Sequence, residues 1–150
     1  MRKSAIVIAG FPGIGKSWFI ETRAKGKRVV DLEPSPFKYD NDQSEHWPSN
    51  YLTAVHQAMA ESDLVLIATY PEIITTLVAE GVDVIVVYPD SSQSAEYKKR
   101  YRVRGNHERV IEMLVKSFES NIENLVALDG CTHIVLKSGQ YLSDVIGEIV

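Results

Sequence analysis

The sequence has very little cysteine, no long apolar run and no excess of basic charge, and each of these absences excludes a class of protein. Its one cysteine, Cys131, excludes an intramolecular disulfide and fits a reducing compartment. No apolar run approaches the roughly 20 residues of a membrane span, and the first, Ala5–Ala9, is short for the core of a secretory signal. We therefore predict a cytoplasmic protein with no membrane partner.

The charge and composition are those of an ordinary globular chain. Sixteen basic and 20 acidic side chains give a net charge of -4, which argues against a protein whose whole surface binds nucleic acid. With 150 residues, of which 45% are apolar and 24% charged, the chain is long enough for one core. We predict a single domain over residues 1–150.

Short apolar runs alternate with segments of helical periodicity along the whole chain. The runs predict strands at 5–9, 29–31, 64–68, 84–88 and 132–136, and the periodic segments predict helices at 16–24, 48–62, 71–81, 91–104, 106–126 and 141–150. Residues 32–47 are predicted to form a functional loop. Strands that alternate with helices indicate a parallel sheet with helices on both faces, which is an α/β three-layer sandwich.

The strongest local signal is an octapeptide directly after the first predicted strand. Gly10-Phe11-Pro12-Gly13-Ile14-Gly15-Lys16-Ser17 matches G-x-x-x-x-G-K-[ST] at every position. Glycines let the backbone turn its N–H groups toward anionic oxygens, and the following helix directs its positive end to the same point. We expect Lys16 to bridge the β- and γ-phosphates and Ser17 to ligate Mg²⁺. The candidate cofactor-binding residues here are Gly10, Gly13, Ile14, Gly15, Lys16, Ser17 and Trp18.

Two other interpretations of the octapeptide compete with phosphate binding. One is a glycine turn that only joins a strand to a helix. The other is a dinucleotide-binding loop, which requires a glycine at position 18, where the chain has Trp18. For Trp18 itself, packing of the first helix is the alternative to recognition. The complete octapeptide in its strand–helix context resembles the P-loop NTPase superfamily.

Within that superfamily, the chain resembles the small nucleoside and nucleotide kinases. ATPases and GTPases carry an acid at the end of a later strand, whereas the third predicted strand ends Ala68-Thr69-Tyr70. More narrowly, the chain is similar to kinase-like P-loop proteins of phages, on Tyr88-Pro89-Asp90, the segment from Arg100-Tyr101 to Arg104-Gly105-Asn106, and Leu136–Gly139. The resemblance implies a five-stranded parallel sheet in the order 2-3-1-4-5.

An acidic pair lies at the carboxyl end of the second predicted strand. Asp31 and Glu33 resemble the Asp-x-Asp segment of small-molecule P-loop kinases, where a carboxylate accepts the proton of the attacking hydroxyl or holds Mg²⁺ through water. The resemblance makes Asp31 a candidate catalytic residue and metal ligand. Asp31 and Glu33, with Trp47 and Tyr70, are the candidate substrate-binding residues. The alternatives are an ordinary turn acid and, for Trp47, a half-buried loop anchor.

Basic residues gather in the segment 91–109, which we predict to be a lid over the phosphates. Arg100 and Arg104 lie four positions apart on one helix face, and arginine forks neutralise a transferring phosphoryl group well. With Lys16 and Asp31, they are the candidate catalytic residues, and Gly105 supplies a hinge. A solvated charged helix and a nucleic-acid patch are the alternatives for this segment.

The segment after the fifth predicted strand completes the expected site. By the same resemblance, Lys137 and Ser138 bracket the purine of ATP, and a plain strand-to-helix turn is the alternative. These features together predict ATP- and Mg²⁺-dependent phosphoryl transfer to a small acceptor, with a nucleoside or nucleoside monophosphate favoured. A polynucleotide 5′-hydroxyl kinase and a non-catalytic ATP-binding regulatory module are the alternative functions.

Overall fold

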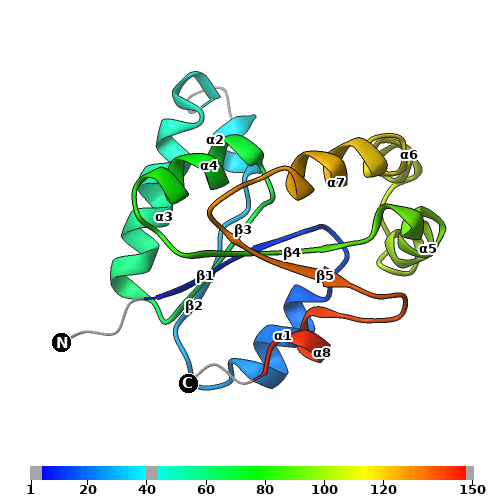
Figure 1. The fold of residues 1–150 in the computed structure, drawn as a ribbon, viewed down its shortest axis with the longest axis horizontal. Helices are drawn as coiled ribbons and strands as arrows, with labels where there is room; N and C mark the ends of the chain where they lie inside the picture. The colour runs from blue at the N-terminus through cyan, green and yellow to red at the C-terminus, as the bar shows by residue number, and fades with distance from the viewer. Residues whose placement is uncertain (1–4, 40–43, 148–150) are drawn as a thin grey trace.

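Five parallel strands form the centre of the fold, which a computed structural model describes for residues 5–39 and 44–147. The strands are β1 (Ile6–Gly10), β2 (Val29–Asp31), β3 (Leu64–Ile67), β4 (Val84–Pro89) and β5 (Thr132–Leu136). They pair in the order β2-β3-β1-β4-β5, with every pair parallel (Figure 1). The predicted α/β class, parallel sheet and strand order are confirmed.

Helices cover both faces of the sheet. On one face lie α1 (Lys16–Arg23) and α8 (Leu142–Val145), and on the other lie α3 (Ser49–Glu61), α4 (Pro71–Ala79) and α7 (Phe118–Val126) (Figure 1). The helices α5 (Ser94–Val103) and α6 (Glu108–Lys116) lie beyond the carboxyl end of β4. The one-turn helix α2 (Ser35–Lys38) and the 3₁₀ turns η1 (Ser44–His46) and η2 (Ser91–Gln93) lie in connections.

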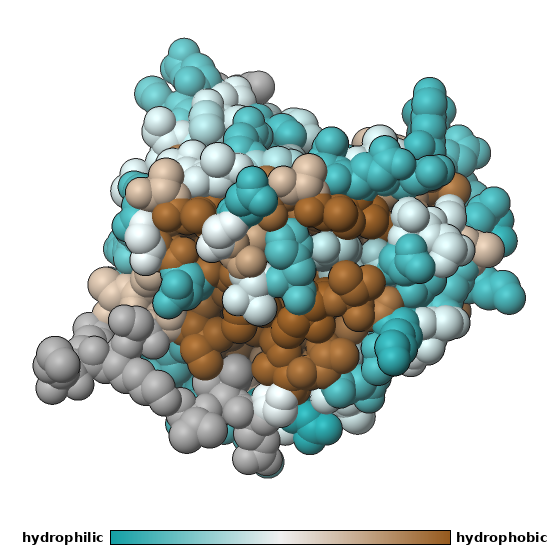
Figure 2. Space-filling model, viewed as in Figure 1, coloured by the Kyte–Doolittle hydropathy of each residue, from teal (hydrophilic) through white to brown (hydrophobic). Residues whose placement is uncertain are grey.

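The two central strands read as continuous apolar runs because both of their faces are covered. All four residues of β3 are fully buried, and β1 is buried from Val7 to Gly10. Burying one such aliphatic side chain contributes about 1.5–3 kcal/mol. The edge strand β5 is more exposed: Val135 is 48% accessible, and Figure 2 shows apolar residues gathered over the face where β5 lies. The buried β1 therefore lies in the middle of the sheet, and its carboxyl end leads into the segment that precedes α1.

Three predicted boundaries differ from the structure. The segment 32–47, predicted as a loop, contains α2 and η1, and Pro36 within the first turn of α2 favours helix initiation. The predicted helix 106–126 is divided into α6 and α7 at Ser117, whose hydroxyl donates to the carbonyl of Met113 and competes with the backbone ladder. In the described part of the predicted helix 141–150, only Leu142–Val145 are helical; residues 148–150 lie outside the described residues.

The predicted lid segment 91–109 consists of η2, α5 and the turn into α6. The predicted break at Gly105 is confirmed, since α5 ends at Val103 and Gly105 has a φ of +83°. Across residues 5–39 and 44–147, none of the helices combines the length and hydropathy needed to cross a bilayer.

Candidate nucleotide site

A cavity of about 1010 Å³ opens at the carboxyl ends of the strands. It lies where β1 and β3 are neighbours but lead to connections on opposite faces of the sheet, which is where open α/β sheets bind ligands. Segments far apart in the sequence line it: the Gly10–Ser17 loop, the ends of β2 and β3, α5, α6, α7 and the turn after β5. The charged lining residues are Lys16, Asp31, Glu33, Glu96, Lys99, Arg100 and Arg104.

The Gly10–Ser17 loop joins β1 directly to α1. Gly13 and Gly15 have φ angles of +91° and +86°, a region that residues with a Cβ rarely adopt. Gly15 is the N-cap of α1 and has no side chain to accept the first N–H groups of the helix. These N–H groups and the positive end of the helix dipole therefore meet at the cavity, where an anion is stabilised.

Lys16 and Ser17, the first two residues of α1, both line the cavity. The stem of Lys16 folds back along the loop: its Cδ lies 3.2 Å from where a Cβ on Gly10 would stand. Trp18 is 62% exposed and also lines the cavity, so it is free to contact a ligand. The side chain of Ile14 is fully buried and its carbonyl accepts the N–H of Leu142 at 2.8 Å, so the predicted role of Ile14 rests on its backbone N–H alone.

Arg100 is buried, with 8% of its side chain exposed, and connects three segments around the cavity. Its Nη1 donates to the carbonyl of Gly13 at 3.0 Å and to the hydroxyl of Tyr97 at 3.0 Å. Its Nη2 donates to Glu96 at 3.0 Å and to the carbonyl of Gln140 at 2.8 Å. In this arrangement Arg100 is a positioning residue for the loop.

Two exposed basic residues of this segment line the cavity: Lys99 on α5 and Arg104, the C-cap residue directly after α5. Among the described residues, none forms a hydrogen bond or an ion pair with the guanidinium of Arg104. Of the two arginines predicted to be catalytic, Arg104 is therefore the one whose charge is free to meet a ligand.

The turn after β5 is held by Glu96, a residue that sequence reasoning did not single out. Glu96 accepts hydrogen bonds from the hydroxyl of Ser138 at 2.6 Å and from the N–H of Gly139 at 3.1 Å. The hydrogen bond from the Ser138 hydroxyl has the largest effect and lowers the pKa of the Glu96 carboxyl. Burial opposes it, and the Gly139 N–H and Arg100 lower the pKa further, so that the pKa lies below its ordinary value.

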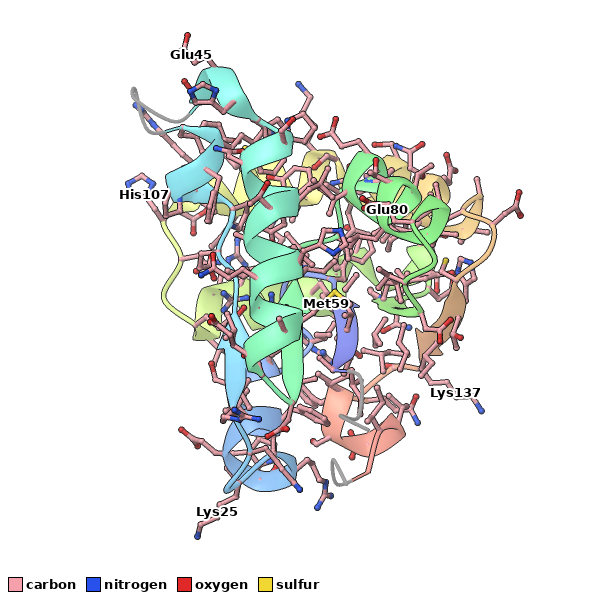
Figure 3. All side chains as sticks on the ribbon, turned by 90° about the vertical axis from the view of Figure 1, so that its left-hand side faces the viewer. Lys25, Glu45, Met59, Glu80, His107 and Lys137 are labelled. Carbon is pink, nitrogen blue, oxygen red and sulfur yellow. The ribbon has the colours of Figure 1, made fainter. Side chains whose placement is uncertain are left out.

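The residues expected to bracket a purine do not line the cavity themselves. Lys137 is exposed and extends away from the molecule (Figure 3), and the hydroxyl of Ser138 is bonded to Glu96. The neighbouring Gly139 and Tyr141 do line the cavity, and the Tyr141 ring lies 3.9 Å from the guanidinium carbon of Arg100. No signal in the sequence distinguishes these neighbours from the residues expected.

On the opposite side of the cavity, Asp31 is the last residue of β2 and Glu33 lies two positions further, as predicted, and both are exposed and line the cavity. The backbone there is held by Tyr51, another residue missed at the level of sequence. Its hydroxyl donates to the carbonyl of Leu32 at 2.7 Å and accepts from the N–H of Ala68 at 3.2 Å, which joins the ends of β2 and β3. Burial raises the pKa of Tyr51, so the hydroxyl keeps its proton for this bond.

Of the two aromatic residues predicted to contact substrate, Tyr70 lines the cavity and Trp47 does not. The Trp47 ring packs 5.2 Å from the ring of Tyr70 and 5.3 Å from that of Tyr51, centroid to centroid. Its Nε1 donates to Glu72 at 3.2 Å. Trp47 therefore packs against Tyr70 outside the cavity lining, as the alternative of a half-buried loop anchor predicts.

The chemistry of the lining fits Mg²⁺. Ser17 offers a hydroxyl and Asp31 a carboxylate, both facing the cavity. Magnesium keeps several waters and binds through one or two protein oxygens together with phosphate oxygens, so a complete protein cage is not required. In the part of the chain that the structure describes, no group of three His, Cys, Asp or Glu side chains is placed to hold a metal.

Comparison with known proteins adds no family to these observations. The chain matches no protein-family model, and none of the curated proteins shows significant similarity to it.

Proposed function

We propose that the protein binds ATP with Mg²⁺ and transfers the γ-phosphoryl group to the hydroxyl of a small acceptor. The observation that carries the proposal is the Gly10–Ser17 loop, with positive φ at two glycines and free N–H groups at the start of α1, facing the cavity. A cavity of about 1010 Å³ is large enough for a nucleotide together with a small acceptor, since ordinary ligand pockets measure roughly 300–1,000 Å³.

In this proposal, different lining residues bind the phosphates, hold the metal and orient the acceptor. The loop amides and Lys16 hold the phosphate oxygens, and Ser17 with Asp31 holds the metal. Mg²⁺, when bound, neutralises charge on the β- and γ-phosphate oxygens. Arg104 and Lys99 add positive charge from α5 where charge develops during transfer, and Asp31 orients the acceptor hydroxyl and accepts its proton.

A transfer assay with labelled ATP and Mg²⁺ tests this function. The acceptors are nucleosides, nucleoside monophosphates, 5′-hydroxyl oligonucleotides and small hydroxylated metabolites. Lys16→Ala should reduce transfer by about 100-fold or more, the loss typical of removing one preorganised charge-stabilising group. Lys25→Ala is the matched control, because Lys25 is exposed beyond the end of α1 and extends into solvent (Figure 3).

Each outcome of that assay has a definite meaning. A product that forms equally well with Lys16→Ala would contradict the proposal. ATP binding that depends on Lys16, with no transfer to any acceptor, would replace it with a non-catalytic ATP-binding module.

A further inference from the structure

The cavity carries opposite charges on its two sides. The basic side consists of the Gly10–Ser17 loop, α5 and the C-cap residue of α5, which contribute Lys16, Lys99, Arg100 and Arg104, and the one carboxylate on this side, that of Glu96, is paired with Arg100. We call the opposite side, formed by residues 31–34 and 68–71 at the ends of β2 and β3, the acceptor wall. The acceptor wall carries the carboxylates of Asp31 and Glu33, and no basic side chain stands among its residues.

Among the described residues, the ammonium of Lys38 brings one positive charge close to the acceptor wall, although Lys38 does not line the cavity. The parts of α6 and α7 that line the cavity contribute Met113, Leu114, Ser117 and Asn121, all uncharged. Lys38 is the basic residue on the adjacent α2.

The ammonium of Lys38 packs against the aromatic rings beside the acceptor wall. Its nitrogen lies 4.2 Å from the centroid of the Tyr70 ring, 5.5 Å from that of Trp47 and 5.6 Å from that of Tyr39. Aromatic faces attract cations electrostatically, and the ring of Tyr70 also forms part of the acceptor wall. The acceptor wall therefore carries two carboxylates against the nearby ammonium of Lys38, a balance of charge that favours uncharged hydrogen-bond donors over anions.

We propose that the acceptor is a hydroxylated molecule without a phosphate or carboxylate group, of the class of nucleosides, sugars or amino alcohols, and that Glu33 excludes phosphorylated compounds. This inference rests on the proposed function and narrows it, because it removes nucleoside monophosphates from the acceptors. In the transfer step the acceptor hydroxyl oxygen forms a bond to the γ-phosphorus as the bond from that phosphorus to the bridging oxygen breaks. ADP leaves, and the hydroxyl proton passes to Asp31.

The size of the discrimination follows from Coulomb's law. At a separation of about 6 Å and an effective dielectric constant of about 40, each carboxylate weakens the binding of a singly charged anion about tenfold. With Asp31 and Glu33 both on the acceptor wall, the unphosphorylated member of a matched pair should bind at least tenfold more tightly than its phosphomonoester.

The experiment measures binding and transfer for matched pairs, such as a nucleoside and its 5′-monophosphate or a sugar and its phosphate. Binding is measured by calorimetry on the protein saturated with a non-hydrolysable ATP analogue and Mg²⁺, so that the Gly10–Ser17 loop is occupied, and transfer is measured with labelled ATP and Mg²⁺. We expect at least one unphosphorylated member to bind, its phosphorylated partner to bind at least about tenfold more weakly, and the label to enter the unphosphorylated member. The inference is overturned if a phosphorylated member binds equally or better, or if no unphosphorylated member binds.

A charge-removing variant tests Glu33 directly. Glu33→Gln should reduce the discrimination within a pair about tenfold by relieving the repulsion of the phosphorylated member. Glu61→Gln, which removes an exposed carboxylate at the end of α3 outside the cavity, should leave the discrimination unchanged. Unchanged discrimination in Glu33→Gln would refute the role of Glu33. The analogue is titrated alone first: its failure to bind refutes the proposed function and this inference with it, whereas binding of the analogue without discrimination within a pair refutes this inference alone.

Discussion

Replacing Arg100 with alanine removes the side chain that joins the Gly10–Ser17 loop, α5 and the turn after β5. The carbonyls of Gly13 and Gln140 lose their donors, and the carboxylate of Glu96 loses its buried cation. The guanidinium also lies between two aromatic rings, 4.3 Å from Tyr97 and 3.9 Å from Tyr141. We expect a large loss of stability for one substitution.

The magnitude follows from the burial of the two partners. Removing one partner of a buried ion pair costs about 3–5 kcal/mol, because the other charge is left without compensation. Arg100 is 8% exposed but Glu96 is 28% exposed, and Glu96 keeps its bonds to Ser138 and Gly139, so we place the loss at about 3 kcal/mol. For a chain of this length, about 3 kcal/mol lowers the melting temperature by roughly 6–12 °C.

Urea unfolding and thermal melts measure this loss, with Arg102→Ala as the matched control. Arg102 belongs to the same helix, but its ion pair with Glu108 spans 3.8 Å between side chains that are 53% and 66% exposed. Such surface pairs contribute about 0–1 kcal/mol, so the control should melt close to the wild type. A loss below about 1 kcal/mol in Arg100→Ala would refute the assignment of Arg100 as the connector.

Three further predictions concern the residues around the site. Gly13→Ala places a Cβ 3.0 Å from the Tyr101 ring at a positive φ, whereas the control Gly26→Ala places a Cβ in open space at a similar positive φ. In urea unfolding, Gly13→Ala should therefore lose about 1–3 kcal/mol more stability than Gly26→Ala. Equal losses would show that the tyrosine rings move aside at no cost. Tyr51→Phe should cost about 1–3 kcal/mol because two backbone groups lose their partner, and an unchanged urea midpoint would argue against that bridge. Because its pKa is lowered in the fold, the Glu96 carboxylate contributes stability above its ordinary pKa of 4.5 that is lost as the pH falls. Melts between about pH 5 and 3 should therefore fall less steeply for Glu96→Gln than for the wild type, and parallel curves would contradict this.

The elements of the fold that were predicted are those whose signal is local. The strands are short β-branched runs, and their order follows from the family that the octapeptide resembles. The division of 106–126 at Ser117 could not be read from the sequence, because Ile111, Phe118 and Ile122 keep helical spacing across it and all three are buried. The one-turn α2 is too short to show any periodicity.

In the site, too, the residues that could be predicted were those with a local sequence signal. The Gly10–Ser17 loop and Asp31 were found because each is contiguous in the chain or ends a strand. Arg100 was expected to be catalytic because charge spacing shows only that it shares a helix face with Arg104. Its actual partners, Gly13 and Gln140, lie 87 and 40 positions away in the sequence, and no pattern in a single sequence reports such contacts.

The attachments of Arg100 also bear on how the protein opens locally. Since one side chain holds the loop, α5 and the turn after β5, none of the three can detach without breaking bonds to the others. Segments linked in this way open as one cooperative unit, and their amide hydrogens exchange with solvent at a common rate. The N–H groups of Ile14, in the loop after β1, and of Gly139, in the turn after β5, should therefore share one protection factor, and a ligand bound to the loop should slow the exchange of both.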